Sequence, residues 1–194
     1  MKYYLLIAAM LLSSALWSQQ WTKDYDNYDD FANGLAMVTK AGKKGYVNHE
    51  GKVVIPLVYE EAMQFSEGMA AVKKGSRWGF IDSTGKEVVP CEFSDANSFS
   101  NGRGLVSKGN NYGFVDRRGN LVVPLIYDNA SRFGDGLAPV SKKGMWGFID
   151  LNGREVIPFR YGFATSFEQG FGKVLKSNGK WYFVDKNGKE SAVN

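Results

Sequence analysis

Few side chains in this sequence have the chemistry of a nucleophile, a general base or a metal ligand. His49 is the only histidine and Cys91 the only cysteine among the 194 residues. A zinc site built on these two residue types needs more of them and is excluded. A Ser-His-Asp or Cys-His nucleophile would have to use His49, and the sequence has no G-x-S-x-G segment. We therefore expect no enzyme activity, no cofactor and no metal site, with His49 exposed in a turn.

The acidic residues that recur most regularly lie one in each repeated segment, at Asp82, Asp116, Asp150 and Asp185. Each stands three residues before a glycine, as in D-S-T-G. There the carboxylate can accept hydrogen bonds from backbone amides further along the turn. We expect the copies to hold these carboxylates too far apart to act as a general acid and base. The aspartates are therefore predicted to form turns.

A column of aromatic residues is the strongest candidate for ligand binding. It consists of Trp78, Tyr112, Trp146 and Trp181. Rings at regular spacing can stack on the faces of sugars. Alternatively, each ring is buried between copies, since a large aromatic side chain removes about 150–250 Å² from water, a gain of several kcal/mol at about 25 cal/mol per Å². The sequence leaves both interpretations open.

Basic residues gather in the first turn of each copy, notably Lys73, Lys74, Arg77, Lys142 and Lys143. Copies that stack in register would place these turns along one rim of a protein whose formal net charge is +4. Such a basic rim would bind an anionic polysaccharide, lipid headgroups or an acidic protein weakly and in a salt-sensitive manner. The alternative is that these turns are simply solvated.

These candidates are positioned by an internal repeat of thirty-four residues. The period is kept by many separate columns, including Pro56, Pro90, Pro124 and Pro158, and Gly45, Gly79, Gly113 and Gly147. The final copy departs by one residue, in the loop Ser177 to Gly179. A fixed period of this length indicates a repeat architecture, and 44% hydrophobic residues suffice for a core.

Each copy is predicted to contain three strands joined by tight turns. The fold class is therefore all-β, a tandem repeat of about five 34-residue three-stranded units. The copies span 31–64, 65–98, 99–132, 133–166 and 167–194, after a partial repeat tail at 19–30.

The proline and the strand glycine of each copy need a physical explanation, because neither residue favours a β-strand. The proline is expected to close the third strand, because it cannot donate a hydrogen bond to the ladder. The glycine inside W-G-F-I-D costs about 0.5–1 kcal/mol relative to alanine. It therefore indicates the close approach of a side chain or backbone, with an aromatic ring of an adjacent copy as the first candidate.

Together these features resemble the WG-repeat family, also called KWG repeats. The resemblance rests on the segments RWGFIDSTGKEVVPCEFSDA, NYGFVDRRGNLVVPLIYDNA and MWGFIDLNGREVIPFRYGFA. It implies an all-β repeat protein from a mostly bacterial family, and it brings no shared catalytic residues. The end copies depart from the pattern: Lys44 stands before Gly45 in place of Trp or Tyr, and Tyr182 stands where glycine is expected. Atypical end copies are typical of capped arrays.

The array is predicted to be an open, twisted, β-solenoid-like arrangement. A copy of 34 residues is short for a four-stranded propeller blade, which takes about 40–45 residues. The alternative is a closed, propeller-like ring. It is suggested by the phase of the repeat, because segment 21–30 corresponds to the end of a copy and the last copy lacks that part.

Residues 1–18 have the layout of a secretory signal peptide, with Lys2, an apolar run from Leu5 to Leu12 and then small residues. We expect cleavage between residues 15 and 18. The apolar run is too short for a bilayer-spanning helix of about 20 residues, so we expect no transmembrane segment in the mature chain. Cys91 has no intramolecular partner, and its otherwise apolar column predicts a buried, unreactive thiol.

The function predicted from these features is that of an exported, non-enzymatic repeat module. It would bind a protein or glycan partner in the cell envelope or outside the cell, as a secreted or periplasmic protein. Export argues against nucleic acid as a partner. The alternatives are a hydrolase of envelope polymers, which would need converging carboxylates, and a purely structural envelope component.

Overall fold

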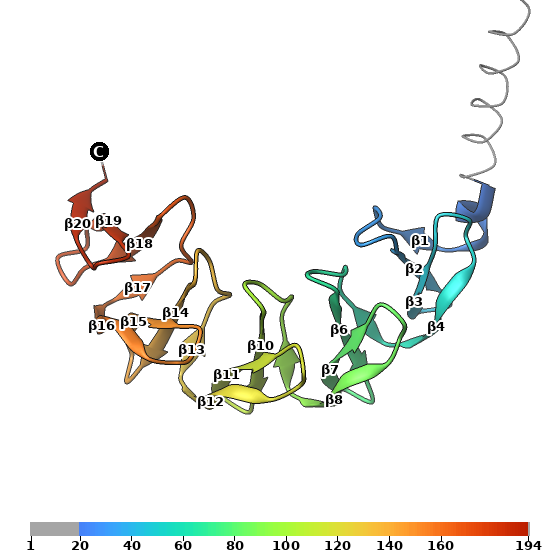
Figure 1. The fold of residues 1–194 in the computed structure, drawn as a ribbon, viewed down its shortest axis with the longest axis horizontal. Coiled ribbons are helices and arrows are strands. Elements are labelled where there is room, and N and C mark those ends of the chain that lie inside the picture. The colour runs from blue at the N-terminus through green and yellow to red at the C-terminus, as the bar shows by residue number, and fades with distance from the viewer. Residues whose placement is uncertain (1–19, 194) are drawn as a thin grey trace, which may run out of the picture.

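The structure is a computed structural model that describes residues 20–193. The predicted signal peptide, residues 1–18, lies outside the described residues. Five four-stranded antiparallel sheets follow one another along the chain, and in each sheet the strands lie side by side in chain order. Figure 1 shows these sheets along an open curve, with β1 near one end and β20 at the other.

Each sheet has a two-residue first strand followed by longer strands. The first sheet contains β1 (Asn27–Tyr28), β2 (Ala36–Lys40), β3 (Lys43–Val47) and β4 (Val53–Tyr59). The second contains β5 (Glu61–Ala62), β6 (Met69–Lys74), β7 (Arg77–Asp82) and β8 (Glu87–Phe93). The third contains β9 (Asp95–Ala96), β10 (Arg103–Lys108), β11 (Asn111–Asp116) and β12 (Leu121–Tyr127). The fourth contains β13 (Asn129–Ala130), β14 (Leu137–Lys142), β15 (Met145–Asp150) and β16 (Glu155–Tyr161). The fifth contains β17 (Phe163–Ala164), β18 (Phe171–Leu175), β19 (Trp181–Asp185) and β20 (Glu190–Ala192).

The prediction of three strands in each unit is wrong, because each unit has a fourth, short strand. The segment expected to cross between copies contains that strand, which pairs with the strand after it, as Ala62 does with Val72. A strand of two residues is too short to show an alternating pattern, so the sequence gives no sign of it. Four strands fit into 34 residues because this one is so short. The predicted boundary at residue 65 falls in the loop between β5 and β6.

The glycine of the W-G-F-I-D strand faces a β-bulge in the neighbouring strand. In the fourth sheet, Trp146 pairs with Tyr161 and Phe148 with Ile157, so β16 has two more residues than β15 over this stretch. A Cβ atom added to Gly147 would lie 2.7 Å from the carbonyl oxygen of Ile157. The predicted close approach is therefore confirmed, but it comes from the backbone of the same sheet and not from an aromatic ring of an adjacent copy.

The proline lies inside the third long strand and does not close it. Pro158 is exposed in the middle of β16, at the bulge, where the ladder of hydrogen bonds is interrupted. A missing N–H has little consequence at such a place. In the fifth sheet, Tyr182 takes the glycine position, and β19 pairs with β20 without a register shift. The glycine and the bulge thus occur together and are lost together.

The sheets stack face to face, and the hydrophobic core lies between them. One face of the second sheet presents Met69, Ala71 and Phe80. These pack in one cluster with Val106 of β10 and with Phe99 of the loop between β9 and β10. The rings of Phe80 and Phe99 meet edge to face, with centroids 4.9 Å apart. Such a pair contributes about 0.5–1.5 kcal/mol beyond the area it buries. The same contact recurs at the other three junctions.

In each sheet a tight turn with left-handed residues lies between the first and second strands, on the concave side of the arc (Figure 1). Hydrogen bonds join such turns of successive sheets. The Glu67 carboxylate accepts hydrogen bonds from the backbone N–H groups of Asn101 and Gly102, at 2.9 and 2.7 Å. The Asn101 side chain accepts one in turn from Gly136, and Asp135 accepts one from Gly170. From the second sheet onward, each turn thus fixes the position of the next.

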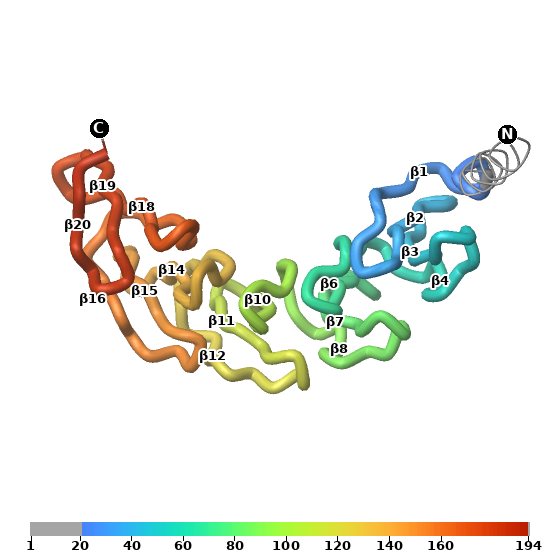
Figure 2. The backbone as a smooth tube through the Cα atoms, turned by 45° about the horizontal axis from the view of Figure 1, so that its top comes forward, coloured from blue at the N-terminus to red at the C-terminus, as the bar shows by residue number. Residues whose placement is uncertain are grey.

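The outer face of the first sheet is covered by the segment that precedes it. The short 3-10 helix η1 (Gln20–Asp24) carries Trp21, which packs with Tyr25 against Ala36, Val38 and Val47. Within residues 20–193, no helix is both long and apolar enough to cross a membrane. Figure 2 shows the two ends of the array well apart, so the sheets formed by residues 20–193 do not close into a ring.

Candidate functional site

The aromatic column does not form one continuous ladder. Trp78 and Tyr112 are half-buried, Trp146 is only 7% exposed, and Trp181 is 41% exposed. Phe163, which stands where earlier copies have Asn, Asp or Glu, bridges two members of the column. Its ring centroid lies 5.1 Å from that of Trp146 and 6.1 Å from that of Trp181. Burial is therefore greatest at the third member and is lost at the fourth.

The residues of the predicted basic rim lie on two hairpins of separate sheets. Lys73, Lys74 and Arg77 belong to the β6–β7 hairpin, and Lys142 and Lys143 to the β14–β15 hairpin, with the third sheet between them in chain order. All five are exposed except Lys73, which is half-buried, with its Nζ 5.9 Å from the ring centroid of Trp78. The structure therefore does not gather these five residues into one cluster.

Acidic residues stand beside lysines of the corresponding hairpins in the first and third sheets. Lys43 contacts Glu60 at 3.0 Å, Lys44 contacts Glu61 at 2.8 Å, and Lys108 lies 3.8 Å from Glu92. Exposed pairs of this kind contribute about 0–1 kcal/mol each to stability. Their main effect here is to reduce the local positive charge. The rim is therefore mixed in sign over this part of the array.

The fifth sheet exposes the kind of face that the earlier sheets bury. We call this surface the terminal aromatic face; its residues are Phe163, Phe171, Trp181 and Phe183. Phe171 is 49% exposed, whereas the corresponding residue of the fourth sheet, Leu137, is 6% exposed. Phe183 is half-buried, whereas Phe148 is fully buried. No sheet covers this face within residues 20–193.

One side of the terminal aromatic face is hollowed into an open depression of about 760 Å³. Phe171 and Phe183 form its apolar part, with ring centroids 6.3 Å apart. Lys173 holds its Nζ 5.6 Å from the Phe183 centroid, and Arg132 adds a second cation from the preceding sheet. Glu168 adds one carboxylate to the lining. The depression therefore combines aromatic surface with two cations and one anion, which suits an apolar ligand that carries polar or charged groups.

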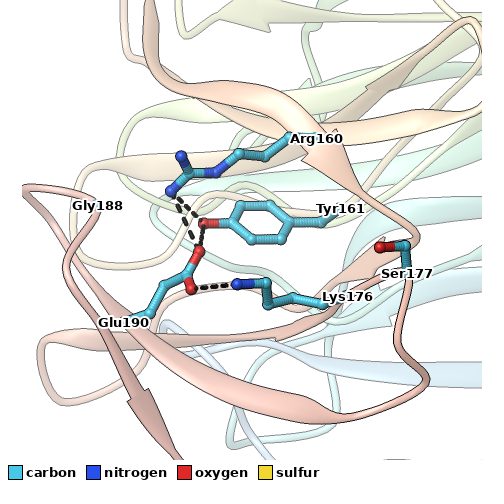
Figure 3. Close-up of a pocket in the computed structure, with 6 residues that line it drawn as sticks. All are labelled: Arg160, Tyr161, Lys176, Ser177, Gly188 and Glu190. Atoms are coloured by element: carbon cyan, nitrogen blue, oxygen red, sulfur yellow. Dashed lines mark hydrogen bonds and ion pairs between the residues drawn. The ribbon is translucent and has the colours of Figure 1, made fainter.

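A second concavity, which we call the junction pocket, lies between the fourth and fifth sheets (Figure 3). Its volume is about 370 Å³, and its lining residues are Arg160, Tyr161, Lys176, Ser177, Gly188 and Glu190. The Glu190 carboxylate is its centre. One oxygen accepts hydrogen bonds from the Tyr161 hydroxyl at 2.8 Å and the Arg160 guanidinium at 3.2 Å, and the other accepts one from Lys176 at 2.9 Å.

The electrostatics of the junction pocket follow from these contacts. The hydrogen bond from Lys176, with help from Tyr161, holds the pKa of Glu190 below its usual range. The same bond with Glu190 raises the pKa of Lys176. Burial raises the pKa of the Tyr161 phenol. All three groups therefore keep their ordinary neutral-pH charges, and the pocket holds two cations and one carboxylate.

The residues singled out for catalysis or metal binding have structural partners. The Asp82 carboxylate accepts hydrogen bonds from the N–H groups of Thr84 and Lys86, and the Asp116, Asp150 and Asp185 carboxylates do the same in their turns. The predicted turn role is confirmed. His49 is exposed, as predicted, and stacks on Phe31 with centroids 3.9 Å apart.

Cys91 is less buried than predicted. It is half-buried, and its thiol lies 3.8 Å from the carbonyl oxygen of Val72. Burial, with the nearby Glu87, raises its pKa to about 11. Within residues 20–193, no three His, Cys, Asp or Glu side chains lie close enough together to hold a metal ion.

Two features of the site were not predicted from the sequence: the pairing of Arg160 with Glu190, and the role of Phe163. Both lie in the last two copies, where the repeat is least regular. The one-residue slip at Ser177 to Gly179 and the exchange of a polar residue for Phe163 are the signals that mark this region.

Comparison with solved structures finds similar folds at low sequence identity. A eukaryotic initiation factor is 12% identical with a TM-score of 0.55, over 86% of this chain and 54% of that one. The computationally designed Ika8 protein is 14% identical with a TM-score of 0.52, over 83% and 58%. Kluyveromyces lactis Hsv2 is 13% identical with a TM-score of 0.51, over 81% and 58%. The chain thus spans a little over half the length of these proteins, and the likeness concerns the fold alone.

Comparison with curated proteins gives no match. A family model described as WG containing repeat matches five successive segments, at residues 23–43, 45–78, 78–112, 112–146 and 146–181. These segments cover most of the chain and, from the third onward, run from one residue of the aromatic column to the next. On this ground, and on the repeated W-G-F-I-D strand with its facing bulge, the chain belongs to the WG-repeat family.

Proposed function

We propose that this chain is a non-enzymatic repeat module that binds a protein or glycan partner through the terminal aromatic face. One observation carries the proposal: rings at positions that are buried in the preceding sheet are exposed in the fifth, as in Phe171 at 49% and Trp181 at 41%. Exposed aromatic rings of this size are costly to leave in water, and they are enriched where proteins bind partners.

The chemistry of the terminal aromatic face supports either class of partner. Phe163 and Trp181 meet at an interplanar angle of 73°, which forms an open corner of two rings. Such a corner accepts the apolar face of a sugar or an apolar side chain. Lys173 and Arg132 lie at the adjacent depression and would favour partners that carry acidic groups.

We further propose that the module acts outside the cytoplasm, in the cell envelope or as a secreted protein. This rests on the signal-peptide layout of residues 1–18. In this proposal the five sheets form an open, solenoid-like support whose curvature is set by the turn-to-turn hydrogen bonds of Glu67, Asn101 and Asp135. The support holds the terminal aromatic face in a fixed geometry.

The proposal is tested with a panel of soluble polysaccharides and envelope extracts, at low and high salt. Intrinsic tryptophan fluorescence finds binders of the native chain, because Trp181 belongs to the proposed surface, and calorimetric titration then measures the affinity of each variant. For any binder found, Trp181→Ala should weaken affinity at least tenfold. Val156→Ala is the matched control, since Val156 is 43% exposed but lies on β16, outside the face. Equal loss in both variants, or no loss in either, contradicts the proposal.

A further inference from the structure

We propose that the junction pocket is an oxyanion-binding site, in which the free donors of Arg160 and the charge of Lys176 hold the carboxylate or phosphate group of an anionic ligand beside the Glu190 carboxylate. This site is separate from the terminal aromatic face and stands independently of it. Its elements are the end of β16, the loop that follows β18, and the start of β20. It goes beyond partner binding because it assigns a defined chemical group to defined donors.

Some of the hydrogen-bond donors that line the pocket are not used by the protein. Arg160 uses one terminal nitrogen, Nη2, for Glu190 and Tyr161. Within residues 20–193, its Nη1 and Nε groups meet no acceptor, and neither does the hydroxyl of Ser177. The Arg160 side chain is 50% exposed and that of Lys176 is 39% exposed, so both are within reach of a ligand. Charge-assisted hydrogen bonds from such donors to an oxyanion are about twice as strong as neutral ones.

The charge in the pocket is unbalanced toward the positive. Arg160 and Lys176 contribute two positive charges, and Glu190 contributes one negative charge. An added anion would balance the remaining charge. With Nη2 engaged, the Nε–H and Nη1–H groups of Arg160 can each donate a separate charge-assisted hydrogen bond to an oxyanion.

The same place in the other junctions lacks the arginine. At the positions that correspond to Arg160, the earlier sheets carry Val58, Glu92 and Ile126. The lysine is kept at every one of these junctions, as in Lys142 for Lys176. The hairpin loops differ as well: two residues join the long strands of the middle sheets, whereas the last copy carries an extra residue in the loop that contains Ser177. The sequence is thus most altered where the pocket forms.

Glu190 is the resident carboxylate of this site. Its contacts show that Arg160, Tyr161 and Lys176 can receive a carboxylate in good geometry. A ligand would bind beside it on the free donors. If the network served only to hold β20 against the fourth sheet, then neutralising Glu190 would lower stability without creating affinity for anions.

The test uses the whole chain, with inorganic phosphate and D-glucuronate as separate probes. Binding is followed by NMR through the backbone amide shifts of Ser177 and Gly188. We expect saturable shifts that Arg160→Ile, which introduces the residue of the preceding junction, weakens at least tenfold. Glu190→Gln should strengthen binding severalfold, because the resident negative charge is gone. Lys142→Gln, at the corresponding position of the preceding junction, should change nothing.

Each outcome bears on the proposal. Binding of phosphate alone indicates a phosphate ester as the natural ligand, and binding of glucuronate identifies a carboxylate. Thermal unfolding of each variant shows whether it is folded, and Arg160→Lys, which keeps the charge, provides a second variant if Arg160→Ile is not. Absence of saturable shifts with both probes overturns the proposal. So does unchanged affinity in a folded Arg160→Ile variant, or loss of affinity in Glu190→Gln.

Discussion

The glycine of the W-G-F-I-D strand offers a quantitative prediction about Gly113→Ala. A Cβ atom at this position would lie 2.5 Å from the carbonyl oxygen of Val123 and 2.9 Å from the carbonyl carbon and oxygen of Pro124. These are backbone atoms on the bulge of β12, which cannot rotate out of the way as a side chain can. Overpacking of this kind costs about 1–3 kcal/mol, against a gain of about 0.5–1 kcal/mol from replacing glycine by alanine. We therefore expect a net loss of about 1–2 kcal/mol.

The control for this prediction is Gly162→Ala. The nearest atom to a Cβ at Gly162 is the carbonyl oxygen of Leu175, 3.6 Å away, which is an ordinary contact. Gly162 also lies outside the left-handed region. Urea unfolding, followed by tryptophan fluorescence and linear extrapolation, should show Gly162→Ala as stable as the native chain or slightly more so. Equal stability of the two variants would refute the explanation of the glycine by the facing bulge.

Three further predictions follow from burial and charge. Trp146→Ala should cost about 3–5 kcal/mol of unfolding free energy, whereas Trp181→Ala at its exposed site should cost about 1 kcal/mol or less; urea titration of both variants checks this. With a pKa of about 11 instead of 9.0, Cys91 should have roughly a hundredfold less thiolate at pH 8 and react slowly with a thiol reagent until urea unfolds the chain. Because folding lowers the pKa of Glu190, its ionised carboxylate stabilises the fold above the unfolded-state pKa of 4.5, and this stabilisation is lost as pH falls through the folded-state pKa. Melting temperatures measured over a series of pH values should therefore fall at acidic pH in the native chain, and Glu190→Gln should lack this part of the fall.

Much of the fold could be predicted from the sequence because repetition makes local signals visible. The period identified the unit, and the aspartate turns were predicted from the residues between two strands. The two-residue first strand of each sheet was not predicted, because two residues are too few to show an alternating pattern. The reason for the glycine was missed because the bulge appears only when two strands are paired, as Phe148 with Ile157.

The candidate site was harder to predict because exposure depends on what covers a sheet. Trp146 and Trp181 occupy the same position of the repeat, yet one lies against a further sheet and the other does not. A one-dimensional pattern cannot separate them. Arg160 and Glu190 lie thirty residues apart in the sequence, and their contact arises from the packing of two sheets.

Hydroxyl-radical footprinting of the free protein, read by mass spectrometry, tests the central claim most directly. That claim is that the sheets bury one another's aromatic faces and leave the terminal aromatic face open for a partner. Trp181 and Phe171 should be oxidised several times faster than Trp146 and Phe148, with allowance for the intrinsic reactivity of each ring type. Similar rates for the two pairs would contradict the claim, because the terminal aromatic face would then be covered in solution.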